Sequence, residues 1–87
     1  MNLRIKNLIN YKWESDKGQR YERWIWNIAF PDGTQKKYTT GIQGKGIYEY
    51  STARLVADDS TFSLNGYSKS GAYLKLRKFV TYGGFSL

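Results

Sequence analysis

The chain contains no cysteine and no histidine among its 87 residues. Disulfide frameworks and the usual zinc sites are therefore excluded, because both depend on those side chains. The absence of cysteine is consistent with a reducing compartment, so we expect a cytoplasmic protein. No stretch approaches the roughly 20 apolar residues that span a bilayer, and charged residues interrupt the apolar positions near the N-terminus. We therefore expect neither a membrane association nor a signal peptide.

Acidic residues are scarce, with seven Asp and Glu against 14 Lys and Arg. General acid–base catalysis near neutral pH usually draws on His or on a carboxylate with a shifted pKa, and no such constellation is evident. Asp58, Asp59 and Glu49 carry oxygens of the kind that hold Mg²⁺, although an Asp pair after a helix is more often a solvated helix end. We therefore expect no enzymatic activity, no metal and no cofactor.

Only one proline is present, and no repeat or low-complexity stretch interrupts the chain. We expect residues 1–87 to form one domain, because this length suits a single core. Aromatic residues are abundant, since three Trp, eight Tyr and four Phe make up 17% of the chain. Each ring buries a large area, so these residues can stabilise a small core without disulfides.

Three segments have the patterns of antiparallel strands. Residues 3–13 and 20–30 alternate between apolar and polar positions, as half-buried strands do, and residues 34–40 follow a turn. The apolar side of the first segment is expected to carry Leu3, Ile5, Ile9, Tyr11 and Trp13, with Asn7 out of pattern, and that of the second Trp24, Trp26, Ile28 and Phe30.

The turn between the second and third segments is Pro31-Asp32-Gly33. Proline presets φ for the first turn position and glycine accepts the left-handed conformation that closes a three-residue loop. This loop would place Trp26 opposite Tyr38 on one face. A slip of one residue would exchange the two faces of the third segment.

The remaining segments admit two interpretations. Residues 47–58 are expected to form a helix, with a strand as the alternative because of their β-branched and aromatic content. Residues 70–82 fit a helix capped by Ser70 and ended by Gly83-Gly84, and also fit a strand. The expected fold is α+β, with a three-stranded antiparallel sheet packed by one or two helices.

The net charge of +7 attracts polyanions at long range, although small domains often carry net charges of about 2–8 for solubility alone. The strand pattern favours polyanion binding over solubility alone, because it gathers basic and amide side chains on the sheet face away from the Trp residues. The alternative is an ordinary solvated sheet face, but no acidic residue falls on this one. The residues expected on it are Arg4, Lys6, Asn10, Lys12, Arg23, Asn27, Gln35 and Lys37.

Lys and Arg neutralise phosphates, whereas Arg, Asn and Gln can also read base edges in the major groove. We therefore expect a nucleic-acid-binding domain, with DNA a more likely ligand than RNA and duplex DNA preferred. A second interpretation has aromatic side chains stack single-stranded bases, but we expect most of the rings in Tyr11, Trp13, Trp24, Trp26 and Tyr38 to be buried. The candidate binding residues are Arg4, Lys6, Lys12, Arg20, Arg23, Asn27, Gln35, Lys36 and Lys37.

The pattern Trp24-x-Trp26-x-Ile28-x-Phe30, followed by Asp32-Gly33, Lys36-Lys37 and Thr40-Gly41, resembles the amino-terminal arm-type DNA-binding domain of phage integrases, which has an AP2-like fold. The resemblance covers roughly residues 10–58. It implies a three-stranded sheet that enters the major groove and a helix behind it containing Glu49, Ala53 and Leu55. The chain departs from that family in its long loop at residues 42–47 and in about thirty further residues.

A protein-binding function is the alternative from another class. Small chains without a catalytic constellation are typical of phage or mobile-element accessory proteins that act as inhibitors or interaction modules. Such a function would leave part of the aromatic surplus exposed, because Trp, Tyr and Arg dominate protein-binding hot spots.

Overall fold

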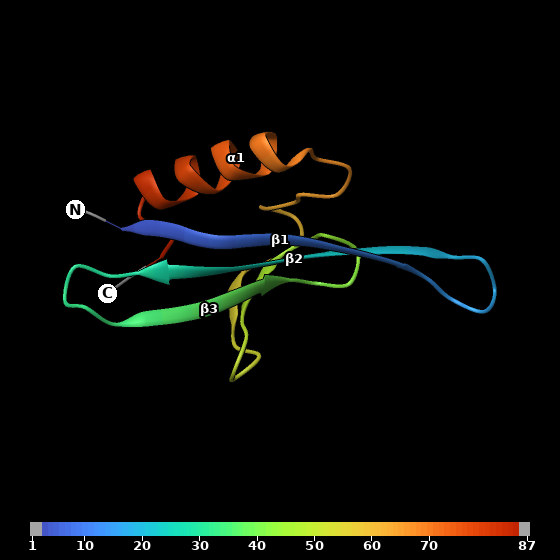
Figure 1. The fold of residues 1–87 in the computed structure, drawn as a ribbon, viewed down its shortest axis with the longest axis horizontal. Helices are drawn as coiled ribbons and strands as arrows, with labels where there is room; N and C mark the ends of the chain where they lie inside the picture. The colour runs from blue at the N-terminus through green and yellow to red at the C-terminus, as the bar shows by residue number, and fades with distance from the viewer. Residues whose placement is uncertain (1–2, 86–87) are drawn as a thin grey trace.

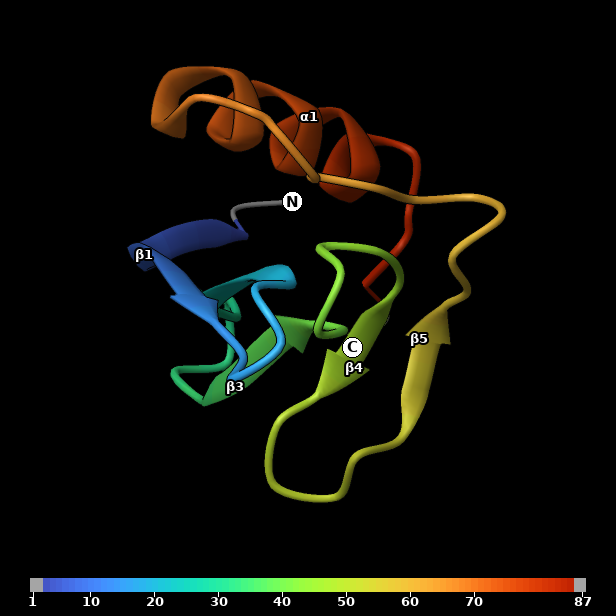
Figure 2. The same cartoon turned by 90° about the vertical axis from the view of Figure 1, so that its right-hand side faces the viewer.

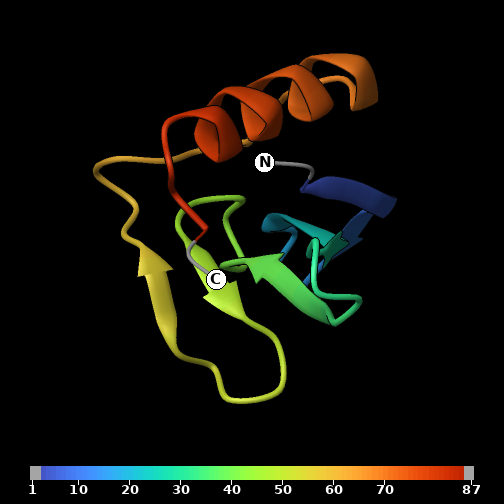
Figure 3. The same cartoon turned by 90° about the vertical axis from the view of Figure 1, so that its left-hand side faces the viewer.

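The computed structural model describes residues 3–85. Within them, five antiparallel strands form one sheet in the order β1-β2-β3-β4-β5, and one helix packs against it. The helix lies across one face of the sheet (Figure 1), and the sheet curls beneath it, with β4 and β5 turned out of the plane of the first three strands (Figures 2 and 3). The α+β class is confirmed, with five strands rather than three. The elements are β1 Arg4–Glu14, β2 Arg20–Ala29, β3 Gln35–Thr40, β4 Ile47–Glu49, β5 Leu55–Ala57 and α1 Lys69–Thr81.

The β2–β3 hairpin has the register predicted from Pro31-Asp32-Gly33. Trp26 lies opposite Tyr38, and their rings stack with centroids 6.4 Å apart. The Gly33 N–H donates to the Phe30 carbonyl at 3.0 Å, and Gly33 has a φ of 91°. The loop therefore has three residues, and the faces of β3 are those that the turn chemistry predicts.

The prediction of a helix over residues 47–58 is wrong, and the strand alternative is confirmed. This segment forms the β4–β5 hairpin, and β4 pairs with β3. Ala53 has a left-handed φ of 56°, which an α-helix does not contain. The Glu49 N–H donates to the Arg54 carbonyl at 2.8 Å, and the Arg54 guanidinium lies 3.2 Å from the Glu49 carboxylate. The β-branched and aromatic content suits a pleated surface, and pairing with β3 satisfies the backbone of β4.

Of the two interpretations of residues 70–82, the structure confirms the helix, which is α1. Its N-cap is Ser68 rather than Ser70, because the Ser68 hydroxyl accepts a hydrogen bond from the Gly71 N–H at 3.2 Å. Among residues 3–85, no helix is long and apolar enough to cross a membrane. The face of α1 toward the sheet carries Ala72 and Leu76, which are buried, and Phe79 and Val80, which are partly buried.

A β-bulge in β1, between Lys6 and Ile9, reverses which side chains of the strand face α1. Asn7 has a left-handed φ of 57°, and Leu8 turns into the core with 6% of its surface exposed. One extra residue in β1 shifts the alternation by one position. The predicted uninterrupted alternation is therefore wrong beyond Lys6. Asn10 and Lys12 lie on the α1 side of the sheet, and Ile9, Tyr11 and Trp13 lie on the opposite side.

The core lies between the sheet and α1. Trp24, Trp26 and Ile28 of β2 are buried there, as their shared position on one face of the strand predicts. The Trp24 indole N–H donates to the Leu64 carbonyl at 3.2 Å. This bond ties the segment that leads into α1 to β2.

Candidate nucleic-acid interface

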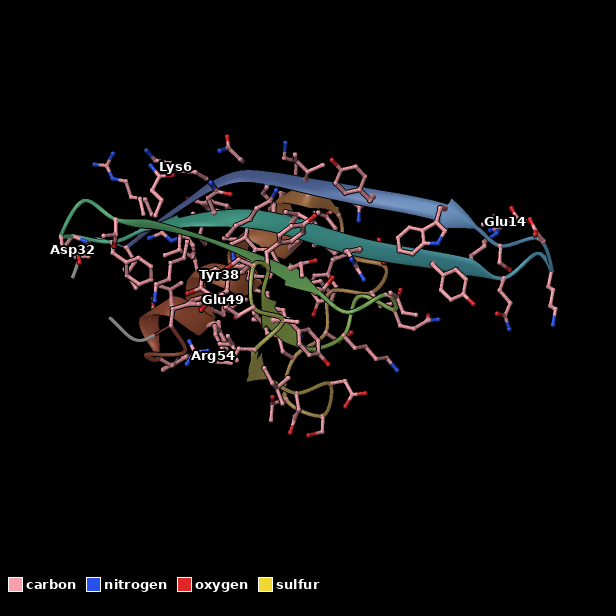
Figure 4. All side chains as sticks on the ribbon, turned by 90° about the horizontal axis from the view of Figure 1, so that it is seen from below. Lys6, Glu14, Asp32, Tyr38, Glu49 and Arg54 are labelled. Carbon is pink, nitrogen blue, oxygen red and sulfur yellow. The ribbon has the colours of Figure 1, made fainter. Side chains whose placement is uncertain are left out.

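Within residues 3–85, no helix packs on the side of β1, β2 and β3 that faces away from α1, and we call this side the open face. Its β3 edge is partly covered, because Thr39 is buried beside Tyr48 of β4. Figure 4 views the sheet from this side, with α1 behind the strands. Residues directly opposite each other in antiparallel strands share a face, so the register identifies its members. They are Arg4, Lys6, Ile9, Tyr11 and Trp13 of β1, Tyr21, Arg23, Ile25, Asn27 and Ala29 of β2, and Gln35, Lys37 and Thr39 of β3.

The structure divides the predicted binding residues between the two sides of the sheet. Lys12 lies on the α1 side because of the bulge, so its predicted placement is wrong, and the same holds for Asn10. Arg20 and Lys36 also lie on the α1 side, the latter because neighbours along a strand point to opposite faces. The open face brings together the others, which are Arg4, Lys6, Arg23, Asn27, Gln35 and Lys37.

Charge is balanced on one side of the β1–β2 ribbon and unbalanced on the other. On the α1 side, Lys12 lies opposite Glu22 and Arg20 lies opposite Glu14. On the open face none of the side chains is acidic. The cations of the open face therefore have no carboxylate among their neighbours on that face, which gives it a positive potential.

One end of the open face, near the β2–β3 turn, is rich in cations and amides. Lys6, Asn27 and Lys37 form a row across the three strands, and Arg4 and Gln35 lie one row further along. All except the half-buried Asn27 are exposed. We call this part the cationic end. It combines groups that bind phosphate with amide groups that both donate and accept hydrogen bonds.

Arg23 occupies the middle of the open face, opposite Tyr11. Its Nε atom is buried and has no hydrogen-bond partner among the described residues. Beside it lies a hollow of about 370 Å³, lined also by Tyr48 and Tyr50. The Lys37 ammonium lies 4.3 Å from the Tyr50 ring centroid. Glu49, the one carboxylate that lines the hollow, accepts a hydrogen bond from Arg54, so a guanidinium already compensates its charge.

The other end of the open face, toward the β1–β2 turn, is aromatic. Tyr11 is 50% exposed and Trp13 is 42% exposed. The Trp13 and Tyr21 rings stack on each other, with centroids 5.6 Å apart and an angle of 27° between their planes. We call Tyr11, Trp13 and Tyr21 the aromatic end. Of the rings that the sequence offered for base stacking, Trp24, Trp26 and Tyr38 are buried, as expected, whereas Tyr11 and Trp13 are not.

A groove of about 850 Å³ runs along the free edge of β1 beneath α1. Arg4 and Lys6 line it from the strand, and Tyr73 and Arg77 line it from the helix. The groove therefore extends the basic surface of the cationic end around the edge of the sheet.

Two of the three carboxylates considered as possible metal ligands, Asp58 and Glu49, have structural contacts of their own. Hydrogen bonds from the side chains and backbone of Ser60 and Thr61 hold the pKa of Asp58 below its usual value of 3.8. The Ser60 hydroxyl donates to the Asp58 carboxylate at 2.7 Å. Within residues 3–85 no three acidic side chains approach closely enough to hold a metal ion. Asp58 therefore closes the turn after β5.

No family model, curated protein or solved structure matches the chain. The resemblance to the integrase arm-type domain stays a prediction. The helix that it implies around Ala53 is absent, because that segment forms the β4–β5 hairpin. The site is therefore interpreted from its own geometry.

Proposed function

We propose that the protein binds nucleic acid through the open face of its sheet. The observation that carries the proposal is the separation of charge between the two sides of the sheet. Lys12 and Arg20 lie opposite carboxylates on the α1 side, whereas the cations of the open face share it with no acid. Charge that served solubility alone would need no such separation.

Phosphate binding accounts for the cations. Lys6 and Lys37 flank Asn27 in one row, and Arg23 adds a guanidinium whose buried Nε atom has no hydrogen-bond partner within residues 3–85. Lys and Arg that neutralise phosphates release condensed counterions, which makes binding depend steeply on salt. A positive face also speeds the encounter with a polyanion.

Two double variants with the same change in net charge test this proposal. Lys6→Gln with Lys37→Gln removes two cations from the open face, and Lys12→Gln with Lys36→Gln removes two from the α1 side of the same strands. Lys36 and Lys37 each lie over an aromatic ring, at 5.7 and 4.3 Å, so the pair also controls for that contact. We expect the open-face variant to weaken oligonucleotide binding and to reduce the slope of log affinity against log salt by roughly 1.4–1.8. The other variant should stay close to the wild type.

Binding is measured by fluorescence anisotropy of a labelled oligonucleotide at several salt concentrations, and melting temperatures confirm that both variants fold. Equal losses in the two variants would mean that net charge alone attracts the ligand, and the proposal would fail. Absence of any binding by the wild type would contradict it as well.

A protein partner is the second candidate, and exposed apolar residues favour it. Ile9 on the open face is 45% exposed and Leu55 of β5 is 53% exposed, and apolar surface of this kind can mark protein contacts. A protein contact of this kind would depend little on Lys6 and Lys37 and would be far less sensitive to salt. The two double variants therefore distinguish the candidates.

A further inference from the structure

The aromatic end lies outside the hydrophobic core, although the stacked Trp13–Tyr21 pair also joins β1 to β2. The core is built from Trp24, Trp26 and the side chains around them, whereas the β1–β2 ribbon that carries Tyr11, Trp13 and Tyr21 extends beyond the end of α1 (Figure 1). Within residues 3–85, Tyr11 and Trp13 are left 50% and 42% exposed. Exposed Trp and Tyr rings leave apolar surface in contact with water. A ligand that covers these rings would bury that surface, which is favourable.

The chemistry of the aromatic end does not suit a double helix. Duplex DNA presents base edges in its grooves, and these are read by hydrogen-bonding side chains. Ile9 and Ile25, which lie next to the aromatic end, have no such groups. The flat faces of bases are accessible only when a strand is unpaired, and aromatic side chains then stack on them.

The spacing of the rows also favours an unpaired strand. Successive open-face positions along one strand, such as Tyr11 and Trp13, are roughly 6.6 Å apart, whereas stacked bases in a duplex are about 3.4 Å apart. Bases that stack on side chains in consecutive rows must therefore be separated from one another. A flexible single strand can adopt that spacing and a duplex cannot.

Cations lie where the backbone of such a strand would pass. Arg23 is opposite Tyr11, at the border between the aromatic end and the middle of the face. Lys6 and Lys37 continue the positive charge toward the β2–β3 turn. The open face thus offers stacking surfaces and phosphate-binding groups in one line along the strands.

We propose that the ligand of the open face is single-stranded nucleic acid, whose bases stack on Tyr11 and on the Trp13–Tyr21 pair while Arg23, Lys6 and Lys37 bind phosphates. This inference rests on the proposed function and makes it more specific. The preference for duplex DNA expected from the sequence is replaced by a preference for an unpaired strand, because the bulge in β1 brings the aromatic side chains to this face.

The test compares oligo(dT), oligo(rU) of equal length and a mixed-sequence duplex at two salt concentrations. Binding is followed by tryptophan fluorescence, in which Trp13 is the accessible indole because Trp24 and Trp26 are buried. We expect oligo(dT), oligo(rU) or both to bind more tightly than the duplex and to quench the emission. The relative affinities of oligo(dT) and oligo(rU) show whether the protein prefers DNA or RNA.

Variants locate the contact. The variants are compared by fluorescence anisotropy of a labelled strand, because Trp13 is itself the accessible indole. Trp13→Ala should weaken single-strand binding about tenfold, and Tyr11→Leu should also weaken it. Tyr82→Leu is the matched control, because Tyr82 is exposed at the end of α1, away from the open face. Unchanged melting temperatures confirm the fold, and Tyr11→Leu keeps the test valid if Trp13→Ala does not fold.

The outcomes separate the two proposals. Tighter duplex binding, or single-strand binding that neither Trp13→Ala nor Tyr11→Leu weakens, would overturn the single-strand inference while leaving nucleic-acid binding intact. No binding to any of the three probes would overturn both and leave the protein-partner candidate.

Discussion

Asn7 determines which side chains of β1 lie on the open face. Its left-handed φ of 57° allows one extra residue in β1, and Leu8 fills the core position that uninterrupted alternation would give to a neighbour. Without the bulge, Asn10 and Lys12 would lie on the open face, and Tyr11 and Trp13 would point toward α1. Asparagine is one of the few residues other than glycine that adopts this conformation at low cost.

Substitution of Asn7 tests this role. Asn7→Val places a β-branched residue in the left-handed region, and we expect it to lower the free energy of unfolding by about 1–3 kcal/mol. Asn7→Gly is the control and should change stability little, because glycine adopts positive φ freely. Urea denaturation of the three proteins measures the difference. If the valine variant were as stable as the wild type, Asn7 would not need the left-handed conformation.

The same residue shows why part of the candidate site could not be read from the sequence. The alternation of residues 3–13 has one polar interruption on its apolar side, which is Asn7. A polar residue at that position is compatible with a bulge and equally with an imperfect strand. The identity of Asn7 was therefore the one available sign that the faces exchange, and periodicity alone does not interpret it.

At the level of secondary structure, the β2–β3 hairpin followed from local chemistry and the β4–β5 hairpin did not. Pro31-Asp32-Gly33 fixes a loop length, and the loop length fixes the register of every pair in the hairpin. Residues 47–58 contain no such turn. Their strands are three residues each and depend on pairing with β3, which is a tertiary contact that a helical periodicity of apolar residues cannot reveal.

The helix α1 offers a matched pair of leucines for testing how the sheet is covered. Leu76 is fully buried against the core, whereas Leu74, on the same helix, is 60% exposed. We expect Leu76→Ala to lower the free energy of unfolding by about 2–5 kcal/mol, and Leu74→Ala to change it by less than about 0.5 kcal/mol. Thermal and urea denaturation measure both. Similar effects from the two variants would contradict the observed orientation of α1.

For the molecule as a whole, charge and aromatic content suggest a kind of ligand but do not say which surface would bind it. A net charge of +7 indicates a polyanion but assigns it to no surface. The register of β2 and β3 correctly placed Arg23, Asn27, Gln35 and Lys37 on one face. The curled sheet and its single covering helix then leave that face open, which is a property of the assembled layers and of no single segment.

Three indole groups and one guanidinium allow the central claim to be tested in a single experiment. Trp13 and Arg23 lie on the open face, whereas Trp24 and Trp26 lie in the core. A titration of the ¹⁵N-labelled protein with oligo(dT) resolves the side-chain N–H signals of all four residues. We predict that the signals of Trp13 and Arg23 shift progressively to saturation while those of Trp24 and Trp26 stay nearly constant. Saturable shifts confined to α1, or no shifts when oligo(dT), oligo(rU) and duplex DNA are added in separate titrations, would contradict nucleic-acid binding by the open face.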